Sequence, residues 1–334
     1  MSVGIEDVAQ KAGVSIATVS RVLADKPHVS QKARQAVLTA VHELGYRPNQ
    51  AARNLRSQTS KRLGLLISDI QNPFFTVMAR AVEDIAYERE YLVMLCNTDE
   101  DAQRESLYID LMVSEQVAGV ILSPIASTGE AVQQLTDAGI PVVLVDRHIP
   151  NAQFDSVVGE NFNTTKRLIL HLIEKGHKRI GAIIAAPSVS TGSERQEGYI
   201  QALYERGISF DPNLLLGGGP KAANGYELTQ QLLGLPDPPT AIFSGNNLLT
   251  IGALRAIHNA GLSIPEQIAL VAYDDMDWMF VMQPSLTVVS QPVYEMGKQA
   301  AQLMLQRIDE PQMHPVNIVL EPTILFRGSS GTKR

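Results

Sequence analysis

From Arg62 onward, short runs of aliphatic residues alternate with amphipathic stretches, and the whole alternation occurs twice. Each run has the length of a buried strand, and each intervening stretch is long enough for a helix. The expected strands are RLGLLIS (62–68), YLVMLCN (91–97), AGVILSP (118–124) and PVVLVD (141–146) in the first set, and RIGAIIA (179–185), LLLG (214–217), TAIFSG (240–245) and IALVAYD (268–274) in the second. The expected helices lie near 75–90, 101–116 and 129–138, and near 161–175, 193–206, 224–234 and 246–260. Because such alternation buries parallel sheets between helices, it predicts two doubly wound α/β lobes.

Composition restricts the class of protein. The 334 residues are 45% apolar and 19% charged, which is typical of a globular chain with two or three domains. No run approaches the roughly 18 apolar residues of a membrane span, and acids appear by Glu6, where a signal peptide needs an apolar core. The single Cys96 cannot form an internal disulfide framework, and no motif resembles a metal site. We therefore expect a cytoplasmic protein without membrane contact, metal or cofactor.

Charge is distributed unevenly along the chain. Residues 1–62 contain ten Lys and Arg against four Asp and Glu, while the remainder contains 18 basic and 31 acidic residues. A small basic end on a large acidic body is typical of a nucleic-acid-binding segment attached to a sensor or an enzyme.

The basic end contains three short helical patterns. Gly13 ends the first helix, Ser15 is placed as N-cap of the second and Ser30 as N-cap of the third, which Gly45 ends. The apolar positions at helical spacing are Ile5, Val8, Ala9 and Ala12, then Val19, Val22 and Leu23, then Ala33, Ala36, Val37, Ala40, Val41 and Leu44. Two helices joined by a tight glycine turn and braced by a third predict an all-α helix-turn-helix headpiece over residues 1–46.

The second helix has the residues of a DNA-reading helix on its outer side. Burial of its apolar positions turns Ile16, Ala17 and Arg21 outward, where they could enter a major groove. Arg21 suits guanine, the two short apolar residues suit thymine methyl groups, and Thr18 suits a phosphate. The alternative is a helical adaptor with a solvated arginine.

Residues 47–60 follow as a hinge. Asn49 can cap a short Ala-rich helix that includes Ala52, and such a helix is too short to be stable alone in water. Two copies in a minor groove could bury each other, with Leu55 inserted between base steps. The alternative for this segment is a plain polar linker.

The stretches IEDVAQKAGVSIATVSRVLADKPHVS and GYRPNQAARNLRS closely resemble the headpiece and hinge of the LacI/GalR (lactose/galactose repressor) family of bacterial transcription regulators, and the resemblance extends to Arg327. It implies a periplasmic-binding-protein-like core with an N-terminal lobe of residues 61–160 and 291–322, a C-terminal lobe of residues 161–290, and a C-terminal strand and tail at 323–334. From the residues alone, the segment after 290 could instead be a separate appendage. The DNA-contacting residues expected from the pattern and the resemblance are Ser15, Ile16, Ala17, Thr18, Arg21, His28, Ser30, Asn49, Ala52 and Leu55.

Polar and aromatic side chains follow the predicted strands at their carboxyl ends, where open α/β sheets bind ligands. The candidates are Asn72, Phe74, Phe75, Asp146, Arg147, Arg195, Asn246, Asp274 and Gln291. Each has a structural alternative: the phenylalanines could be core residues, Asp146 and Arg147 an ion pair, and Asn246 and Asp274 helix caps. Their convergence on one cleft favours a sugar site, because acids and amides accept and donate to hydroxyls while rings contact the C–H face.

The same nine residues match the polar and aromatic set of ribose-binding clamps. Pro220 departs from this pattern, since relatives usually place an aromatic residue there, and Asn247 replaces a more usual Asp. The resemblance therefore implies a pentose or a similar small sugar rather than ribose specifically.

The remaining motifs do not favour catalysis. His177 is expected to be structural, Trp278 to belong to an interface patch, and the Gly217–Gly219 run lacks the Lys-Ser/Thr of a phosphate loop. We therefore expect a non-enzymatic repressor that binds palindromic operator DNA as a homodimer. Compared with the lactose repressor, the segment GSSGTKR takes the place of C-terminal leucine heptads, so we expect a dimer rather than a tetramer. The alternatives are a solute-binding transport protein, and a regulator that responds to a nucleobase or a partner phosphoprotein.

Overall fold

The computed structural model describes residues 3–331, except 24–26, 28, 47–59 and 126–128. The chain divides into two compact units, residues 1–60 and residues 61–334. The expected DNA-contacting residues His28, Asn49, Ala52 and Leu55 lie outside the described residues.

The described part of the first unit contains three helices, α1 (Ile5–Ala12), α2 (Ile16–Leu23) and α3 (Gln31–Leu44). Gly13 and Gly45 end α1 and α3 in the left-handed conformation, with φ of 64° and 61°. The Ser15 hydroxyl accepts a hydrogen bond from Thr18 N (3.2 Å), and the Ser30 hydroxyl accepts one from Ala33 N (3.3 Å). The three helices pack around a small core of Val8, Ala9, Val19, Val22, Val37 and Ala40. The helix-turn-helix and its caps are thus confirmed.

The second unit begins with a lobe built on a parallel sheet, in the order β11-β5-β4-β3-β1-β2. The strands are β1 (Arg62–Ile67), β2 (Leu92–Asn97), β3 (Gly119–Leu122), β4 (Val142–Val145), β5 (Asp155–Gly159) and β11 (Asn317–Leu320). One face is covered by α5 (Pro73–Glu88) and α13 (Val293–Asp309), and the other by α6 (Ala102–Ser114) and α7 (Glu130–Asp137). We call this the first lobe.

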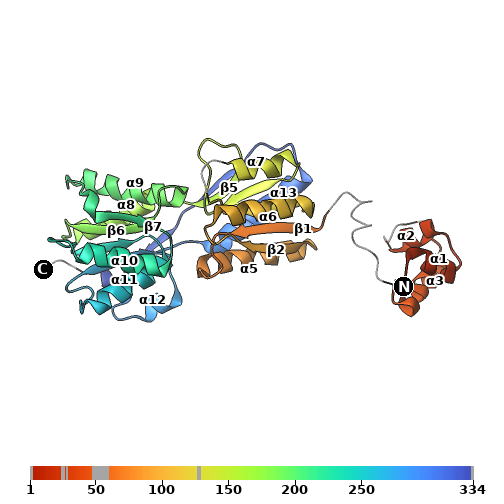
Figure 1. Ribbon diagram of the computed structural model, residues 1–334, viewed down its shortest axis with the longest axis horizontal. Coiled ribbons are helices and arrows are strands. Elements are labelled where there is room, and N and C mark those ends of the chain that lie inside the picture. The colour runs from red at the N-terminus through yellow and green to blue at the C-terminus, as the bar shows by residue number, and fades with distance from the viewer. Residues whose placement is uncertain (1–2, 24–26, 28, 47–59, 126–128, 332–334) are drawn as a thin grey trace. The chain divides into compact units, whose positions relative to one another are not determined.

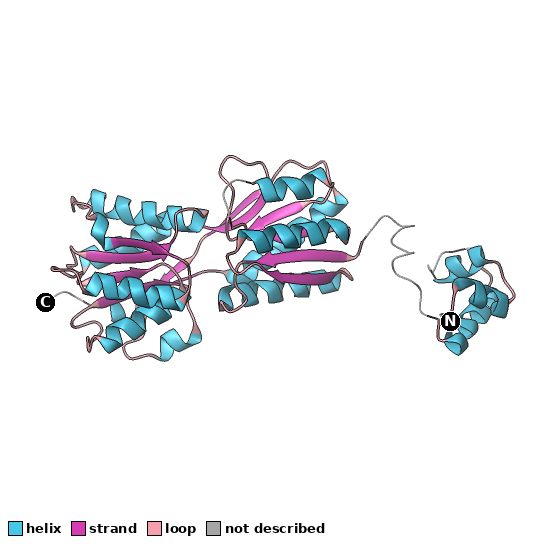
Figure 2. Cartoon of the chain, viewed as in Figure 1, coloured by secondary structure: helices cyan, strands magenta, loops and turns pink. Residues whose placement is uncertain are grey.

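The second lobe repeats this plan in the order β12-β10-β9-β8-β6-β7, with β12 antiparallel to β10. Its strands are β6 (Ile180–Ala185), β7 (Leu215–Gly218), β8 (Ala241–Ser244), β9 (Ala269–Tyr273), β10 (Thr287–Ser290) and β12 (Thr323–Leu325). Its helices are α8 (Phe162–Glu174), α9 (Ser190–Glu205), α10 (Ala222–Leu233), α11 (Asn247–Asn259) and α12 (Asp277–Val281), with short 3-10 turns at Pro212–Leu214 and Gly328–Ser330. Figure 2 shows helices on both sides of the strands in each lobe.

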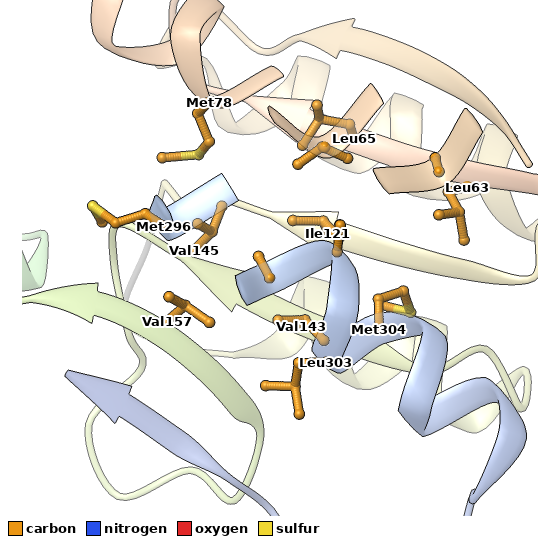
Figure 3. Close-up of a cluster of buried hydrophobic side chains, with 14 of the residues drawn as sticks. Leu63, Leu65, Met78, Ile121, Val143, Val145, Val157, Met296, Leu303 and Met304 are labelled. Atoms are coloured by element: carbon orange, nitrogen blue, oxygen red, sulfur yellow. The ribbon is translucent and has the colours of Figure 1, made fainter. Parts of the chain in front are cut away.

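The chain crosses back into the first lobe after β10. Figure 1 shows α13 near β5, and α13 packs with α5 on one face of the first sheet, although it lies more than 100 residues later in the chain than either element. Its Met296 and Met304 pack with Leu65 of β1 and Ile121 of β3 in one buried cluster (Figure 3). Helix α13 and strand β11 are therefore part of the first lobe, whereas β12 returns to the sheet of the second lobe, so the separate appendage is wrong.

Two short elements are absent from the sequence-based pattern. Strand β5, with the sequence DSVVG, has only two large apolar residues, and it is stabilised by pairing with β4 on one side and β11 on the other. Helix α12 has five residues around the buried Met279, where the sequence suggested an interface patch. Such elements depend on tertiary contacts, so their local periodicity is too weak to predict them.

Helices α10 and α11 approach closely through two glycines. A Cβ atom on Gly225 would lie 2.3 Å from Leu249 O, and one on Gly252 would lie 2.2 Å from Ala222 O. Only glycine permits this separation of the helix backbones. The contact holds the amino ends of both helices, which follow Pro220 and Asn246, in a fixed relation to each other.

Candidate functional site

A small cavity lies between the two lobes, where the strands of both sheets end. Its lining includes all nine side chains expected from the strand ends, namely Asn72, Phe74, Phe75, Asp146, Arg147, Arg195, Asn246, Asp274 and Gln291. Asp69, Glu100, Ala185, Thr191 and Pro220 complete it. The structure therefore brings the predicted residues together at one place.

The two phenylalanines form one wall of the cavity. Asn72 caps α5 by accepting a hydrogen bond from Phe74 N (3.0 Å), and Pro73 occupies the first helical turn. The rings of Phe74 and Phe75 stand at 88° with centroids 5.1 Å apart. Both side chains belong to the first lobe's core and both line the cavity, so the core interpretation is correct and leaves the platform role a prediction.

Arg147 is held by the first lobe while one of its nitrogen atoms stays unpaired. Its two terminal nitrogens donate to both carboxylate oxygens of Glu100, at 2.6 and 2.9 Å, and one also donates to Pro124 O. Its Nε is buried without a hydrogen-bond partner among the described residues, and Asp146 Oδ2 lies 3.6 Å away. A buried unpaired donor costs roughly 1–3 kcal/mol, so this atom is suited to receive an acceptor from a ligand.

Two aspartates occupy equivalent positions in the two lobes. Asp146 follows β4 and Asp274 follows β9, and both have the left-handed conformation, with φ of 66° and 68°. Burial raises the pKa of Asp146 to about 6, although Arg147 and Arg195 oppose the shift. Burial also raises the pKa of Asp274, against the opposing charge of Arg195. Hydroxyl donors would stabilise both carboxylates in their charged form.

The second lobe positions its own cation through a dense set of contacts. Arg195 of α9 donates to Asn161 Oδ1 (2.9 Å) and to Gly245 O (2.6 Å), and its guanidinium lies 3.8 Å from the centre of the Tyr273 ring. These contacts fix the guanidinium at the cavity wall. Two oxygen acceptors and a ring face thus replace the water that the buried guanidinium has lost.

The amides on this side of the cavity also hold the backbone. Asn246 caps α11 by accepting from Leu249 N (2.7 Å), so the cap interpretation is correct for this residue. Asp274 does not cap α12; it accepts from Gln291 Nε2 (2.7 Å) and Asn247 N (3.2 Å). Asn247 Nδ2 donates to Asn72 Oδ1 (2.7 Å), which joins the two lobes across the cavity.

Sequence reasoning missed several residues of the site. Glu100 and Thr191 line the cavity, and Asn161 supports Arg195 from the segment between the lobes. Glu100 follows a predicted strand, as the other candidates do, so that rule could have found it. Asn161 carries no such signal, because its role depends on a contact with a residue 34 positions later.

In the described part of the headpiece, α2 exposes the side chains that were expected on its outer side. Ile16 is 42% exposed, Ala17 and Arg21 are also exposed, and Val19 is fully buried on the opposite side of α2. The Ser15 and Thr18 hydroxyls lie 2.9 Å apart at the start of this helix. The exposed side of α2 therefore carries short side chains at the amino end of the helix and a basic side chain near its carboxyl end.

The chain matches two sequence families, one for each unit. Residues 4–49 match the bacterial regulatory proteins of the lacI family, and residues 60–326 match the periplasmic binding proteins and sugar-binding domain of the LacI family. The chain belongs to the LacI family. It is therefore a transcriptional regulator controlled by an effector, with a helix-turn-helix headpiece and a periplasmic-binding-protein-like core.

Three LacI-family relatives bear on the two sites. The ribose operon repressor of Halalkalibacterium halodurans is 36% identical over 97% of this chain and 96% of its own length. A regulator from Enterococcus faecium, solved with bound ribose, is 30% identical, covers 82% of this chain and 100% of its own, and has a TM-score of 0.74. The lac repressor dimer, solved with operator and an anti-inducer, is 25% identical, covers 99% of this chain and 100% of its own, and has a TM-score of 0.85.

Two kinds of feature are absent from the described residues. Within them, no helix has the length and apolar character needed to cross a bilayer. In the same part of the chain, no three His, Cys, Asp or Glu side chains gather where they could hold a metal ion. Cys96 is buried as a small apolar side chain, and burial raises the pKa of its thiol.

Proposed function

We propose that this protein is a repressor whose affinity for palindromic operator DNA is controlled by a pentose, such as ribose, bound between the lobes. The observation that carries the proposal is the cavity lining, which contains two rings, four carboxylates and Arg147, whose buried Nε has no hydrogen-bond partner among the described residues. The ribose operon repressor and the ribose-bound regulator support the same class of effector.

The charges of the lining favour a neutral ligand. Four carboxylates (Asp69, Glu100, Asp146 and Asp274) line the cavity, against three cations, namely Arg147, Arg195 and the Lys221 ammonium bonded to Asp69. A sugar phosphate or a sugar acid would add negative charge to a buried site that already has an excess of it. Hydroxyl groups can instead donate to the carboxylates and accept from the guanidiniums, while the rings cover the C–H face.

The sugar would act by stabilising lobe closure. It would contact Arg147 and Asp146 from the first lobe and Arg195 and Asp274 from the second, so it binds the closed state more tightly than the open one. A ligand shifts a conformational equilibrium only through such differential affinity. A coupling of about 1–3 kcal/mol between the cavity and the headpiece would change operator affinity roughly 5–150-fold.

The headpiece would read the operator through α2. Arg21 would contact a guanine edge, with Ile16 and Ala17 against thymine methyl groups. The further contacts that we propose are made by Ser15, Thr18, His28 and Ser30 in the headpiece, and by Asn49, Ala52 and Leu55 in the hinge. One α2 helix spans only a half-site, so a palindrome requires a homodimer. Binding to chromosomal DNA would place the protein in the cytoplasm.

Two measurements test this proposal. Isothermal titration of the full chain against pentoses, hexoses, their phosphates and nucleobases should show binding of a neutral pentose, without turnover. Gel shift on the DNA upstream of the gene should then show operator affinity reduced about tenfold or more by that sugar. Binding of a nucleobase instead would replace the effector class, and operator affinity independent of every bound ligand would refute the regulatory link.

The raised pKa of Asp146 predicts a pH dependence of sugar binding. The free site takes up a proton as the pH falls through about 6, whereas sugar hydroxyls prefer the carboxylate. The affinity should therefore be constant above pH 7 and fall by up to about tenfold between pH 7 and pH 5. Titration calorimetry over this range, with proton release measured in two buffers, checks the prediction.

Asp146→Asn is the matched control, because asparagine also tolerates the left-handed conformation. This variant should bind the sugar more weakly and with a flatter pH profile. A profile as steep as that of the wild type would assign the pH dependence to another group, such as Asp274.

A further inference from the structure

One lysine of the second lobe contacts two carboxylates of the first lobe beside the cavity. Lys221 Nζ lies 2.7 Å from Asp69 Oδ2 and 2.5 Å from Asp99 Oδ1. The partners are 152 and 122 residues away in sequence and belong to the other lobe, so both contacts join the two lobes. We call these three residues the Lys221 bridge.

The local structure fixes both sides of this bridge. Lys221 is the first residue before α10, next to the cavity-lining Pro220, and its side chain makes no capping bond to the helix. The glycine contact between α10 and α11 holds this end of the helix in place. On the opposite side, Asp69 follows β1 and Asp99 follows β2, which are adjacent strands of the first sheet.

The bridge is connected to the effector site through adjacent residues. Asp99 and Glu100 both have the left-handed conformation, with φ of 55° and 58°. This turn directs the Asp99 carboxylate to Lys221 and the Glu100 carboxylate to both terminal nitrogens of Arg147. Loss of the bridge therefore frees a turn that also orients a guanidinium of the cavity.

Burial of the Asp69 carboxylate makes the Lys221 bridge important for lobe closure. The Asp69 side chain is 4% exposed in the closed arrangement, whereas Lys221 and Asp99 are 33% and 40% exposed. Hydrogen bonds to the two carboxylates raise the pKa of Lys221, although burial alone would lower it. A carboxylate as buried as Asp69 is costly without a cation, so the closed state needs the ammonium group at this place.

We propose that Lys221 is a positioning residue that holds the lobes closed over the effector and thereby sets the affinity and the release rate of the sugar. The inference rests on the proposed function of the cavity. Pro220 lines the cavity without an aromatic ring, and the bridge lies beside it. In this proposal, opening of the lobes for sugar release breaks both contacts of Lys221.

The test compares Lys221→Met with the wild type by calorimetry of the full chain with ribose, or with whichever sugar of the panel binds. We expect the substitution to weaken the affinity on the order of tenfold, through faster release, since it removes one partner of a partly buried pair. Raising the salt from about 50 to about 500 mM should weaken wild-type binding several-fold and leave the variant unchanged. Lys221→Arg should restore most of the affinity.

Two further variants separate the bridge from simple packing. Asp99→Asn keeps the left-handed turn and removes one charge, and its effect should not add to that of Lys221→Met. The exposed Lys178→Met removes the same charge from the same lobe and should change neither affinity nor its salt dependence. Unchanged affinity in Lys221→Met, or additive losses with an unaltered salt dependence, would overturn the proposal.

Amide exchange of the sugar-free protein tests the Lys221 bridge independently of the proposed effector. If no sugar of the panel binds the wild type, the proposed effector is wrong, and amide exchange of the sugar-free protein then decides on the bridge. Lys221→Met should speed exchange at the cavity-facing starts of α5 and α9 and not in α3 of the headpiece. Equal exchange in both proteins would show that the bridge does not hold the lobes closed.

Discussion

Arg147→Met should reduce sugar affinity at least about a hundredfold, or about 2.7 kcal/mol, and leave a repressor that the sugar no longer controls. In the proposed site the ligand would accept a hydrogen bond from Nε of the guanidinium, whose terminal nitrogens Glu100 already holds. Methionine fills a similar volume but removes the donor and also leaves Glu100 and Asp146 without their buried cation. Calorimetry with the pentose, followed by gel shift with and without it, measures both effects.

Arg147→Lys separates the loss of charge from the loss of geometry. Lysine keeps the cation but cannot bind both oxygens of Glu100 and present a third donor, so its affinity should stay well below that of the wild type. Arg206→Met, on the exposed end of α9, is the matched control and should bind sugar normally. Sugar affinity within twofold of the wild type in Arg147→Met would mean that the ligand lies elsewhere.

Arg21→Ala should remove discrimination between the operator and variant sites, at a cost of about 1–3 kcal/mol for the correct site. The side chain is exposed on the face of α2 opposite the buried Val19, so its removal leaves the headpiece core intact. Sugar affinity should not change, because the cavity belongs to the other unit of the chain. Competition gel shifts with single base-pair changes in each half-site measure the discrimination.

Lys32→Ala provides the comparison for the loss of a positive charge. Lys32 is exposed on α3, and removal of its charge should weaken binding to operator and unrelated DNA by a similar factor. Arg21→Ala should instead bring the two affinities together. Parallel losses on both kinds of DNA in Arg21→Ala would assign this arginine to a phosphate rather than to a base.

The site could be predicted largely from one topological rule. In parallel sheets the carboxyl ends of all strands face the same edge, so the residues after each predicted strand were expected to meet. Asp146, Asn246 and Asp274 follow strands with strong aliphatic patterns, and all three line the cavity. Strand β5 and helix α12 escaped prediction, since neighbouring elements rather than their own periodicity stabilise them.

The sequence alone determined the headpiece, the two α/β lobes and the set of side chains at the strand ends, because burial period, helix caps and glycine stops act over a few residues. Only the tertiary structure decided that α13 returns to the first lobe, that Glu100 holds Arg147 and that Lys221 joins Asp69 and Asp99. These contacts join segments 47 to more than 150 residues apart. No local sequence pattern predicts such a pairing, since the contact stabilises the protein only after both lobes have folded and come together.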